Sequence, residues 1–595
     1  MGLRVSAGIE GRVNPIMSKR PRARWTRGVT IVIASALSCC GLIDAEPLDG
    51  GRTTDGEAGY VGADTAYDAG VDAACDAGRG MLAPRLIAPL STSRVTRRRP
   101  TLRWSLPDGV TDVTVDLCFD RACRRPIGAP TQVTGSSFTP ANDLPVGVVF
   151  WRVHPSTACV TSATWELTVG AGHAAVDTSW GTTLDVNGDG YGDLVVGSGS
   201  AGYVYLGGPS GLATTPATTI PGSPCTEGYV QSGSSISAGD VNGDGYSDLI
   251  VGQASTTSAN TPPGMVVVYL GSASGLGSAP SATLFGPEST QPHDGFGDSV
   301  SGAEDVNGDG YADVIVADPV SGYAYVFLGG ASGPATTPVI TLVEPGIAAG
   351  NVESVVNGGF AFSLAGVGDV NGDGYADVVV DEFTDCFMSQ PSYLYLGGAT
   401  GISPAPTATI AGPKGSGEEF CGTIVVGAGD VNGDGYADVA VSTWGLVSVY
   451  LGSATGLAAV PTSALTALSE SNPFSGFPLA SAGDVNGDGF ADVVVAVGAT
   501  VDGYPSNAYV YLGGATGLSA VPAAVLPGGH GGLHFVAGAG DLNGDGFADV
   551  VLGSPGTGTA TIFLGGPSGV SPANAMTLTG PAGGGFGWCG FGATN

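Results

Sequence analysis

A nine-residue pattern with oxygen-bearing side chains at alternate positions recurs seven times in this sequence. It reads D-[VL]-N-G-D-G-[YF]-x-D, and its copies begin at Asp185, Asp240, Asp305, Asp369, Asp430, Asp484 and Asp541. The side-chain oxygens at positions 1, 3, 5 and 9, with the backbone carbonyl at position 7, can converge on one hard cation. Ca²⁺ takes six to eight oxygen ligands, and glycine at position 6 permits the sharp turn around it. We therefore predict one calcium loop in each copy.

We number the loops 1 to 7 in chain order, and the predicted metal ligands are the residues at positions 1, 3, 5, 7 and 9 of each. They are Asp185, Asn187, Asp189, Tyr191, Asp193, Asp240, Asn242, Asp244, Tyr246, Asp248, Asp305, Asn307, Asp309, Tyr311, Asp313, Asp369, Asn371, Asp373, Tyr375, Asp377, Asp430, Asn432, Asp434, Tyr436, Asp438, Asp484, Asn486, Asp488, Phe490, Asp492, Asp541, Asn543, Asp545, Phe547 and Asp549.

Three other readings of the loop fit it less well. Asn-Gly and Asp-Gly form hairpin turns, but a turn does not need three carboxylates within nine residues. Magnesium demands a stricter octahedron and keeps more of its waters. An EF-hand places its last acid at position 12, between helices. Here the last acid is at position 9, and strand-like runs such as Leu194–Gly197 and Val314–Val316 follow it.

The spacing of the loops indicates the elements that position them. Successive first aspartates are 54 to 65 residues apart, and a second apolar run such as Tyr203–Gly208 follows each strand-like run before a Ser-Gly or Thr-Gly turn. This length suits a four-stranded sheet with its turns. Repeats of this period are typical of solenoids and propellers.

Several loops are preceded by a short Phe/Gly segment, as at Gly295–Gly297 and Gly359–Phe360. With these segments and the seven loops, the sequence from about 174 to 595 resembles FG-GAP or VCBS repeats, the units of the integrin α-chain β-propeller and of many bacterial surface proteins. The resemblance implies an all-β fold, a seven-bladed β-propeller with calcium in the hairpin between the first two strands of each blade. The terminal segment Gly585–Gly592 would help to close the ring; eight blades or a truncated chain are the alternatives.

The first residues are typical of a secretion signal. Basic residues between Lys19 and Arg27 precede an apolar run, Gly28–Ser38, that is too short to span a bilayer. We expect a signal peptide over residues 1–39 whose lipobox-like end makes Cys39 the lipidated residue; Cys40, or a signal without lipid, are the alternatives. Residues 40–84 are rich in Gly, Ala and Asp and predict a flexible tether. The expected location is the outer membrane as a lipoprotein, periplasmic or at the cell surface.

Residues 85–170 differ in character from the repeats. Alternating runs with Pro and Gly between them predict a small β-sandwich, so the fold we expect is a β-sandwich followed by the propeller. Trp104 and the run Phe150–Val153 give it a loose resemblance to a fibronectin type III domain.

The ten cysteines fit an oxidising compartment. Their pairing cannot be read from sequence. Three of them, Cys118, Cys123 and Cys159, fall in the small domain, and in the propeller we considered two pairs, Cys386 with Cys421 and Cys225 with Cys589. Isolated cysteines of this kind do not form a zinc site, which needs close ligand pairs.

Charge is distributed very unevenly. The net charge is −33, and from residue 174 onward 37 acidic side chains face a single basic one, Lys414. Of these acids, 21 belong to the loops. Nucleic acids and anionic membranes require basic surface, so the propeller is unsuited to both. Without metal the loop carboxylates repel one another, and we expect calcium to be structural.

No catalytic constellation stands out. The sequence contains no G-x-S-x-G elbow, HExxH motif or Walker loop, and we expect no enzymatic activity. His530 and His534 have helical spacing in a glycine-rich segment that suits a loop or strand. The acids outside the loops could pair as glycosidase carboxylates but more often face solvent: Asp318, Asp381, Glu382, Asp385, Glu418 and Glu419. Trp444 and Trp588 could stack on sugars, whereas aromatic residues at loop position 7 favour packing between blades.

The sequence therefore predicts a calcium-stabilised binding or adhesion protein at the cell surface. It would recognise a protein or a glycan through a propeller face, touch the membrane only through its lipid, and be a monomer. The alternatives are a lectin, a carbohydrate-active enzyme with two acids in a cleft, and a structural scaffold of the envelope. Fold alone does not decide among them.

Overall fold

The computed structural model describes residues 83–594 with gaps at 96, 108, 156–159, 171–181, 199–200, 222–235, 255–262, 288–294, 346–358, 384–390, 412–423, 444–445, 466–477, 498–505, 530–532, 534, 581–585, 588 and 592. The predicted signal peptide, Cys39 and nearly all of the predicted tether lie outside these residues. Within them no helix is long and apolar enough to cross a membrane. The fold is all-β, and its one helical turn in this part is the 3₁₀ segment η2 (Pro572–Asn574).

Residues between Arg85 and Val169 form two sheets that share one apolar core. One sheet has the order β1 (Arg85–Ala88), β3 (Leu102–Ser105), β6 (Ser137–Phe138), and the other the order β2 (Arg94–Val95), β8 (Trp165–Val169), β7 (Gly147–Pro155), β4 (Asp112–Cys118), β5 (Thr131–Thr134). Alternate residues of β7, among them the fully buried Trp151, enter this core. The predicted sandwich is thus present; its resemblance to fibronectin type III stays a prediction.

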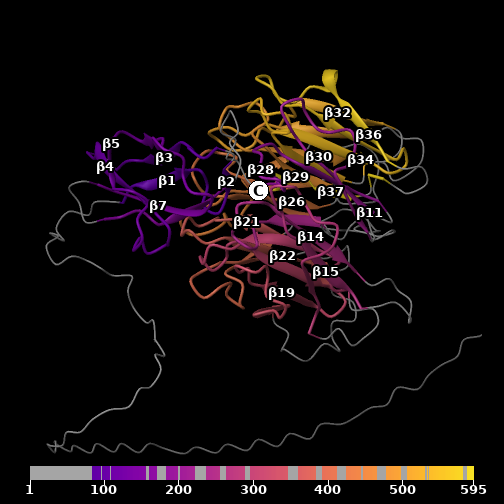
Figure 1. The fold of residues 1–595 in the computed structure, drawn as a ribbon, viewed down its shortest axis with the longest axis horizontal. Helices are drawn as coiled ribbons and strands as arrows, with labels where there is room; N and C mark the ends of the chain where they lie inside the picture. The colour runs from indigo at the N-terminus through magenta and orange to yellow at the C-terminus, as the bar shows by residue number, and fades with distance from the viewer. Residues whose placement is uncertain are drawn as a thin grey trace, which may run out of the picture. The chain divides into compact units, whose positions relative to one another are not determined.

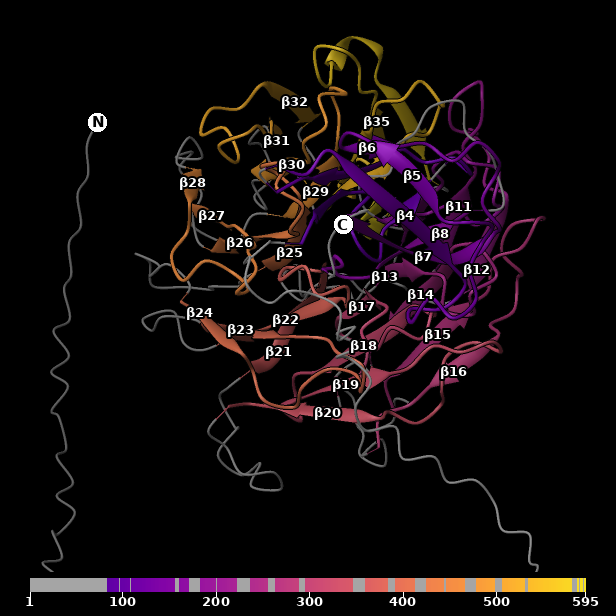
Figure 2. The ribbon, with the colours of Figure 1, turned by 90° about the vertical axis from the view of Figure 1, so that its left-hand side faces the viewer.

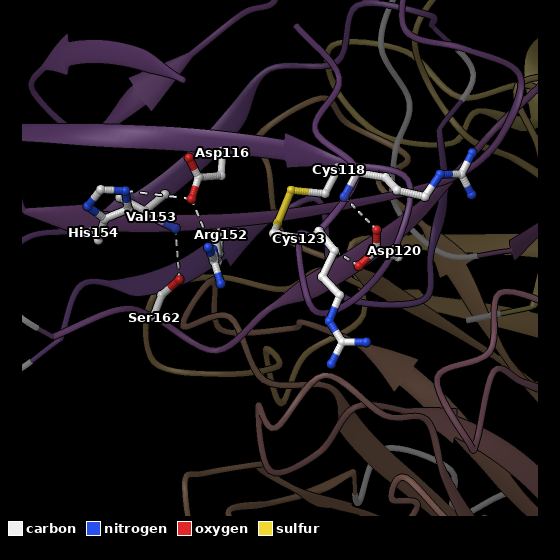
Figure 3. The surroundings of a disulfide bond; sticks show 10 residues. Asp116, Cys118, Asp120, Cys123, Arg152, Val153, His154 and Ser162 are labelled. Atoms are coloured by element: carbon white, nitrogen blue, oxygen red, sulfur yellow. Dashed lines mark hydrogen bonds and ion pairs between the residues drawn. A yellow bond between two sulfur atoms is a disulfide. The ribbon is translucent and has the colours of Figure 1, made fainter. Parts of the chain in front are cut away.

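A disulfide closes the turn after β4. Cys118 and Cys123 are bonded, with their Cα atoms 5.1 Å apart, and Asp120 between them accepts hydrogen bonds from the backbone N–H groups of Arg124 and Arg125 (Figure 3). Cys589 is also disulfide-bonded. Cys225, its partner in the sequence prediction, lies outside the described residues, as do Cys159, Cys386 and Cys421.

The repeats form sheets arranged around a common axis (Figure 2). Each is an antiparallel meander of neighbouring strands, and we number the sheets 1 to 7 after their loops. Sheet 1 contains β10 (Leu194–Gly197), β11 (Ala201–Tyr205) and β12 (Thr218–Pro221); sheet 2 contains β13 (Ile236–Gly239), β14 (Asp248–Gln253), β15 (Met265–Tyr269) and β16 (Ala282–Leu284); sheet 3 contains β17 (Val300–Glu304), β18 (Asp313–Asp318), β19 (Tyr323–Phe327) and β20 (Ile340–Val343).

The remaining sheets repeat this arrangement. Sheet 4 contains β21 (Gly359–Gly368), β22 (Asp377–Phe383), β23 (Pro391–Tyr395) and β24 (Ala408–Ala411); sheet 5 contains β25 (Ile424–Gly429), β26 (Asp438–Thr443), β27 (Leu446–Tyr450) and β28 (Ser463–Leu465); sheet 6 contains β29 (Leu479–Gly483), β30 (Asp492–Val497), β31 (Ser506–Tyr511) and β32 (Ala524–Gly529); sheet 7 contains β33 (Phe535–Gly540), β34 (Asp549–Ser554), β35 (Thr559–Phe563) and β36 (Met576–Thr579).

The C-terminal segment completes the first and last sheets. In sheet 1, β37 (Cys589–Phe591) pairs with β10 where the other sheets have their own first strand. In sheet 7, β38 (Ala593–Thr594) pairs with β33 and with β9 (Thr182–Thr183), which precedes loop 1. The part of the chain that the structure describes contains seven such sheets, and the number of blades stays a prediction of the repeat count.

The cores lie in the seams between sheets. The second strands carry continuous apolar runs, as in Val314–Val316, because a propeller strand is covered on both faces. In the described residues each of seven buried clusters joins two neighbouring sheets, and one of them joins sheet 7 to sheet 1. The core of the sandwich is continuous with the cluster between sheets 4 and 5. Figure 1 shows the sandwich, in indigo, beside the propeller.

Candidate metal centres

Loops 2 to 7 stand between the first and second strands of their sheets, as predicted, and loop 1 stands between β9 and β10. In sheet 3, β17 ends at Glu304, loop 3 begins at Asp305, and β18 begins at Asp313, which is position 9 of the loop. Position 9 is likewise the first residue of the second strand in sheets 2 and 4 to 7. The antiparallel pairing of the two strands therefore holds both ends of the loop and fixes the backbone positions of its first and last residues.

The first aspartate of each loop is a buried acceptor. In loop 4, Oδ1 of Asp369 accepts from the backbone N–H of Asp373 at 3.1 Å, and Oδ2 accepts from that of Gly374 at 2.6 Å. The same two bonds recur in the other six loops. This carboxylate therefore folds the loop around itself, so that the backbone at positions 5 and 6 faces its oxygens.

Positions 3 and 5 form a second, more exposed layer. In loop 4, Asn371 donates from Nδ2 to Oδ2 of Asp373 at 2.9 Å and accepts at Oδ1 from the backbone N–H of Asp373. Oδ1 of Asp373 accepts in turn from the N–H of Tyr375. All seven loops share this arrangement. It is the local side-chain turn that Asn and Asp favour.

Position 9 ties the loop to two strands. In loop 6, Asp492 accepts from the backbone N–H of Val485 at Oδ2, at 2.9 Å, and from that of Gly513 at Oδ1, at 2.8 Å. Gly513 lies just after the third strand of the sheet, and equivalent bonds occur in every loop. The side chains at this position are completely buried. This second anchoring role was not foreseen from the motif.

Burial raises the pKa of the loop carboxyls. It raises the pKa of Asp492 and Asp549 at position 9 to about 8, and the neighbouring position 1 aspartates push in the same direction. At position 1, burial raises the pKa of Asp240 and Asp430 to about 6 and that of Asp369 to about 7. Desolvation disfavours the charged form, and a second carboxylate nearby disfavours it further. Each loop thus holds a buried acidic pair that a cation would stabilise.

The donor chemistry of the loops fits a hard cation. Every predicted side-chain ligand offers oxygen, and a carboxylate oxygen that accepts one backbone N–H keeps a further lone pair. The described residues nevertheless contain no group of three or more His, Cys, Asp or Glu side chains gathered closely enough to hold a metal ion. In the structure the carboxylates turn toward backbone amides of their own loop, so the ligands are present in the right elements but are not assembled around one point.

The loops are linked to one another in a closed circle. The backbone N–H at position 8 donates to the carbonyl of the first aspartate of the preceding loop, as from Ala376 to Asp305 at 3.1 Å. The same bond joins the last loop to the first, from Gly192 to Asp541 at 2.8 Å. The aromatic ring at position 7 covers the glycine at position 4 of the preceding loop, as Tyr191 covers Gly544. The sequence predicts such packing of the position 7 aromatic residues between neighbouring repeats.

Other sequence candidates do not form a second site. Asp381 and Glu382 are neighbours on β22 and therefore point to opposite faces of the strand. Asp381 accepts from the hydroxyl of Ser392 at 2.9 Å, and Glu382 accepts from that of Tyr393 at 2.6 Å. Asp318 accepts at Oδ1 from the N–H of Ser321. The other candidates lie outside the described residues: Asp385, Lys414, Glu418, Glu419, Trp444, His530, His534 and Trp588.

Sequence reasoning also missed residues of the sandwich that contact the loops. Arg94, Arg121 and Glu166 are buried or half-buried against them, and Glu304 beside loop 3 meets the sandwich. Only Glu304 left a signal in the sequence. It stands directly before a loop where five of the other six copies have glycine.

The family model that matches this chain is that of the FG-GAP-like repeat. It matches residues 185–251, 305–380, 430–495 and 484–552, and each stretch begins at the first aspartate of a loop. Two solved structures align over 67% of this chain and 98% of their own chains. One, a protein from Lactobacillus plantarum, has a TM-score of 0.41 at 14% identity. The other, a Bacteroides uniformis protein provisionally described as a 6-phosphogluconolactonase, has a TM-score of 0.40 at 10% identity.

Among curated proteins the chain is similar to integrin α-chains. Integrin alpha-IIb of Mus musculus is 38% identical over 149 residues, which cover 22% of this chain and 14% of that protein. Integrin alpha-4 of Xenopus laevis is 32% identical over 155 residues, which cover 25% and 14%. The chain thus spans about a seventh of the length of these relatives. The loop motif, the sheets and these similarities show that the chain contains FG-GAP-like repeats and is similar to integrin α-chains.

Proposed function

We propose that this protein is a calcium-stabilised binding or adhesion protein of the cell surface. The observation that carries the proposal is the closed circle of seven acidic loops, whose first and ninth positions place carboxylates in buried surroundings. Positions 1, 3, 5, 7 and 9 of each loop would hold Ca²⁺. The ion would supply the positive charge that burial denies these carboxylates, and thereby stabilise the loops.

Removal of calcium tests this proposal. We expect EGTA to lower the melting temperature of the purified chain sharply, because the loop carboxylates then lose their counter-charge in buried surroundings. Added calcium should restore it, with magnesium at the same concentration as the control. An unchanged melting curve in EGTA would contradict a structural role for the ion.

We further propose that a face of the propeller binds a protein or a glycan. The chain is similar to integrin α-chains, which supports a binding role. Asp381 and Glu382, two of the acids considered as glycosidase carboxylates, point to opposite sides of their strand. A lipid on Cys39 would hold the monomeric protein at the outer membrane. Binding of residues 85–595 to a glycan array and to envelope proteins, in calcium and in EGTA, tests this. Calcium-dependent capture of a defined partner supports it; absence of capture with an intact fold favours a scaffold or an enzyme.

A further inference from the structure

The sandwich contacts the propeller at its loops, and a buried arginine spans two of them. Nη2 of Arg94, on β2, donates to the carbonyl oxygen of Gly245 at 2.5 Å; this residue is position 6 of loop 2. The same nitrogen lies 3.8 Å from Oδ2 of Asp185, position 1 of loop 1. Arg94 is 4% exposed. Its positive charge is therefore held beside the acidic positions of two neighbouring loops and away from solvent.

Two more arginines reach the next loops. Arg121 donates from Nη2 to the carbonyl of Gly374, position 6 of loop 4, at 2.6 Å, and its guanidinium lies 4.1 Å from the ring centre of Tyr375. It also pairs with Glu166 at 2.9 Å. Arg85 lies over the ring of Tyr436 in loop 5. These arginines thus lie against loops 1 to 5.

The propeller departs from its own repeat where it meets the sandwich. Glu304, directly before loop 3, has a φ of 53°, whereas the glycines before loops 4 to 7 have φ between 63° and 78°. This left-handed backbone is strained for any residue but glycine. The Glu304 carboxylate accepts a hydrogen bond from Thr92 of the sandwich. It also lines, with Arg94 and Glu166, a pocket between the two parts. The docked position of the sandwich is therefore specified by residues on both sides.

We propose that the docked sandwich sets the calcium affinity of the loops beneath it, with Arg94 as a fixed positive charge that weakens cation binding by loops 1 and 2. The inference rests on the proposed function, because it assumes that the loops bind calcium and says what sets their affinity. A guanidinium cannot give up its charge at any ordinary pH, and like charges repel strongly where water is excluded. Arg94 and a bound cation would also share the carboxylate of Asp185. By reciprocity, calcium in loops 1 and 2 weakens docking of the sandwich.

The tyrosines at position 7 provide an intrinsic spectroscopic probe for this test. Position 7 is tyrosine in loops 1 to 5 and phenylalanine, Phe490 and Phe547, in loops 6 and 7. Terbium, a trivalent probe for calcium sites, emits when an adjacent tyrosine is excited. A position 7 ring also covers the preceding loop, as Tyr191 covers Gly544 of loop 7, so tyrosine-sensitised emission reports loop 7 as well as loops 1 to 5. Equilibrium dialysis of terbium counts all bound ions in the whole chain.

In the natural chain we expect the part of the sensitised emission that comes from loops 1 and 2 to rise at higher terbium concentrations than the first ions counted by dialysis. Arg94→Met removes the charge and keeps the length of the stem; Arg94→Gln also keeps a donor for the Gly245 carbonyl. Both should move part of the sensitised emission to roughly tenfold lower terbium. Arg94→Lys, which keeps the charge, should resemble the natural chain. The matched control is Arg103→Ala, because Arg103 on β3 is exposed.

The outcomes separate the two proposals. If dialysis shows no bound terbium and calcium does not raise the melting temperature, both the calcium proposal and the role of Arg94 are overturned. Bound terbium with the same emission midpoint in the natural chain, Arg94→Met and Arg94→Gln would overturn only the role of Arg94. A shift in Arg94→Gln alone would still support it, because Arg94→Met also removes the contact with Gly245 and can lose the fold of the sandwich.

Discussion

The first and ninth aspartates of a loop are the same residue type in the motif, but their carboxylates accept hydrogen bonds from different parts of the sheet. The carboxylate of Asp484, at position 1 of loop 6, accepts from N–H groups of its own loop. Asp492, at position 9, accepts from Val485 and from Gly513, which lies beyond the third strand. Position 5, Asp488, is exposed and bonds within the loop. Substitutions at these positions should therefore separate folding from cation binding.

We expect Asp492→Ala to destabilise the protein by about 2–4 kcal/mol, because two buried backbone N–H groups lose their acceptor. The loss should appear in EGTA as well as in calcium. Asp488→Ala in the same loop should cost about 1 kcal/mol or less in EGTA and should reduce only the gain from calcium. Urea unfolding of both variants in the two buffers measures this, and equal losses for the two in EGTA would contradict the anchoring role of position 9.

The raised pKa of the position 9 carboxyls predicts how the metal-free protein responds to pH. The pKa of Asp492 and Asp549 is about 8 in the fold, because of burial, and about 3.9 in an unfolded chain. The folded state thus binds these protons more tightly, and their stabilising contribution is present below pH 4 and is lost as pH rises through 8. In EGTA the melting temperature should fall between pH 5.5 and 8. With calcium the fall should shrink, because the ion favours the ionised carboxylates. A melting temperature in EGTA that rises over this range would be the opposite result.

At the scale of elements, the sandwich and the propeller meet at the glycines of position 6. A Cβ atom on Gly245 would lie 2.2 Å from Cγ1 of Val146, in the sandwich, and one on Gly435 would lie 2.6 Å from the carbonyl oxygen of Leu86. These glycines are needed for two reasons, the left-handed turn and the close approach of a second domain. Only the first reason is visible in the repeat.

A pair of alanine variants separates the two reasons. Gly245 and Gly489 occupy position 6 of loops 2 and 6, with φ of 89° and 92°. Gly489→Ala should cost about 1–2 kcal/mol for the left-handed backbone. Gly245→Ala should cost more, because Val146 must move, and it should also loosen the sandwich. Melting curves and the rate of limited proteolysis between residues 83 and 170 measure the two effects. Equal behaviour of the variants would mean that the sandwich does not rest on loop 2.

The loops and strands of the repeats were predictable, because their signals are local. Asn, Asp and Gly at fixed spacing fix the turn, and runs such as Val314–Val316 fix the strand that follows. The sandwich contacts were not predictable. Arg94 and Gly245 are 151 residues apart, and Arg121 and Gly374 are 253 apart. No repeat or spacing connects these residues. Only the docked arrangement of two independently patterned parts brings them together, and the same holds for the pairing of β37 with β10.

For the whole molecule, the seam between sheets 1 and 7 is where two distant parts of the chain meet. Phe586, just before β37, is 1% exposed and lies 5.7 Å from Tyr203, between ring centres. Phe296 has the equivalent place before β17, is fully buried, and lies 5.9 Å from Tyr325. If the seam between the first and last sheets is as tight as the others, the two phenylalanines should contribute equally.

We therefore expect Phe586→Ala and Phe296→Ala each to cost about 3–5 kcal/mol, the usual loss for a buried aromatic. Chemical denaturation midpoints in calcium measure both. Since Phe296 lies inside a continuous stretch of repeats, its variant is the reference for an ordinary seam. A nearly neutral Phe586→Ala beside a costly Phe296→Ala would mean that the ring is open in solution.

The hydrogen bond from the N–H of Gly192 to the carbonyl of Asp541 closes the circle of loops, so the contacts between loops do not depend on where the chain starts. β9 and β38 bring residues 183 and 593 into one sheet, so a short linker could join the two ends of the propeller. New ends could then be opened between any two repeats, since each loop meets its neighbours through the same contacts. The order of the repeats along the chain is in this sense arbitrary. The sandwich, through Arg94, Arg121 and the contact of Thr92 with Glu304, distinguishes the blades that it touches from the others.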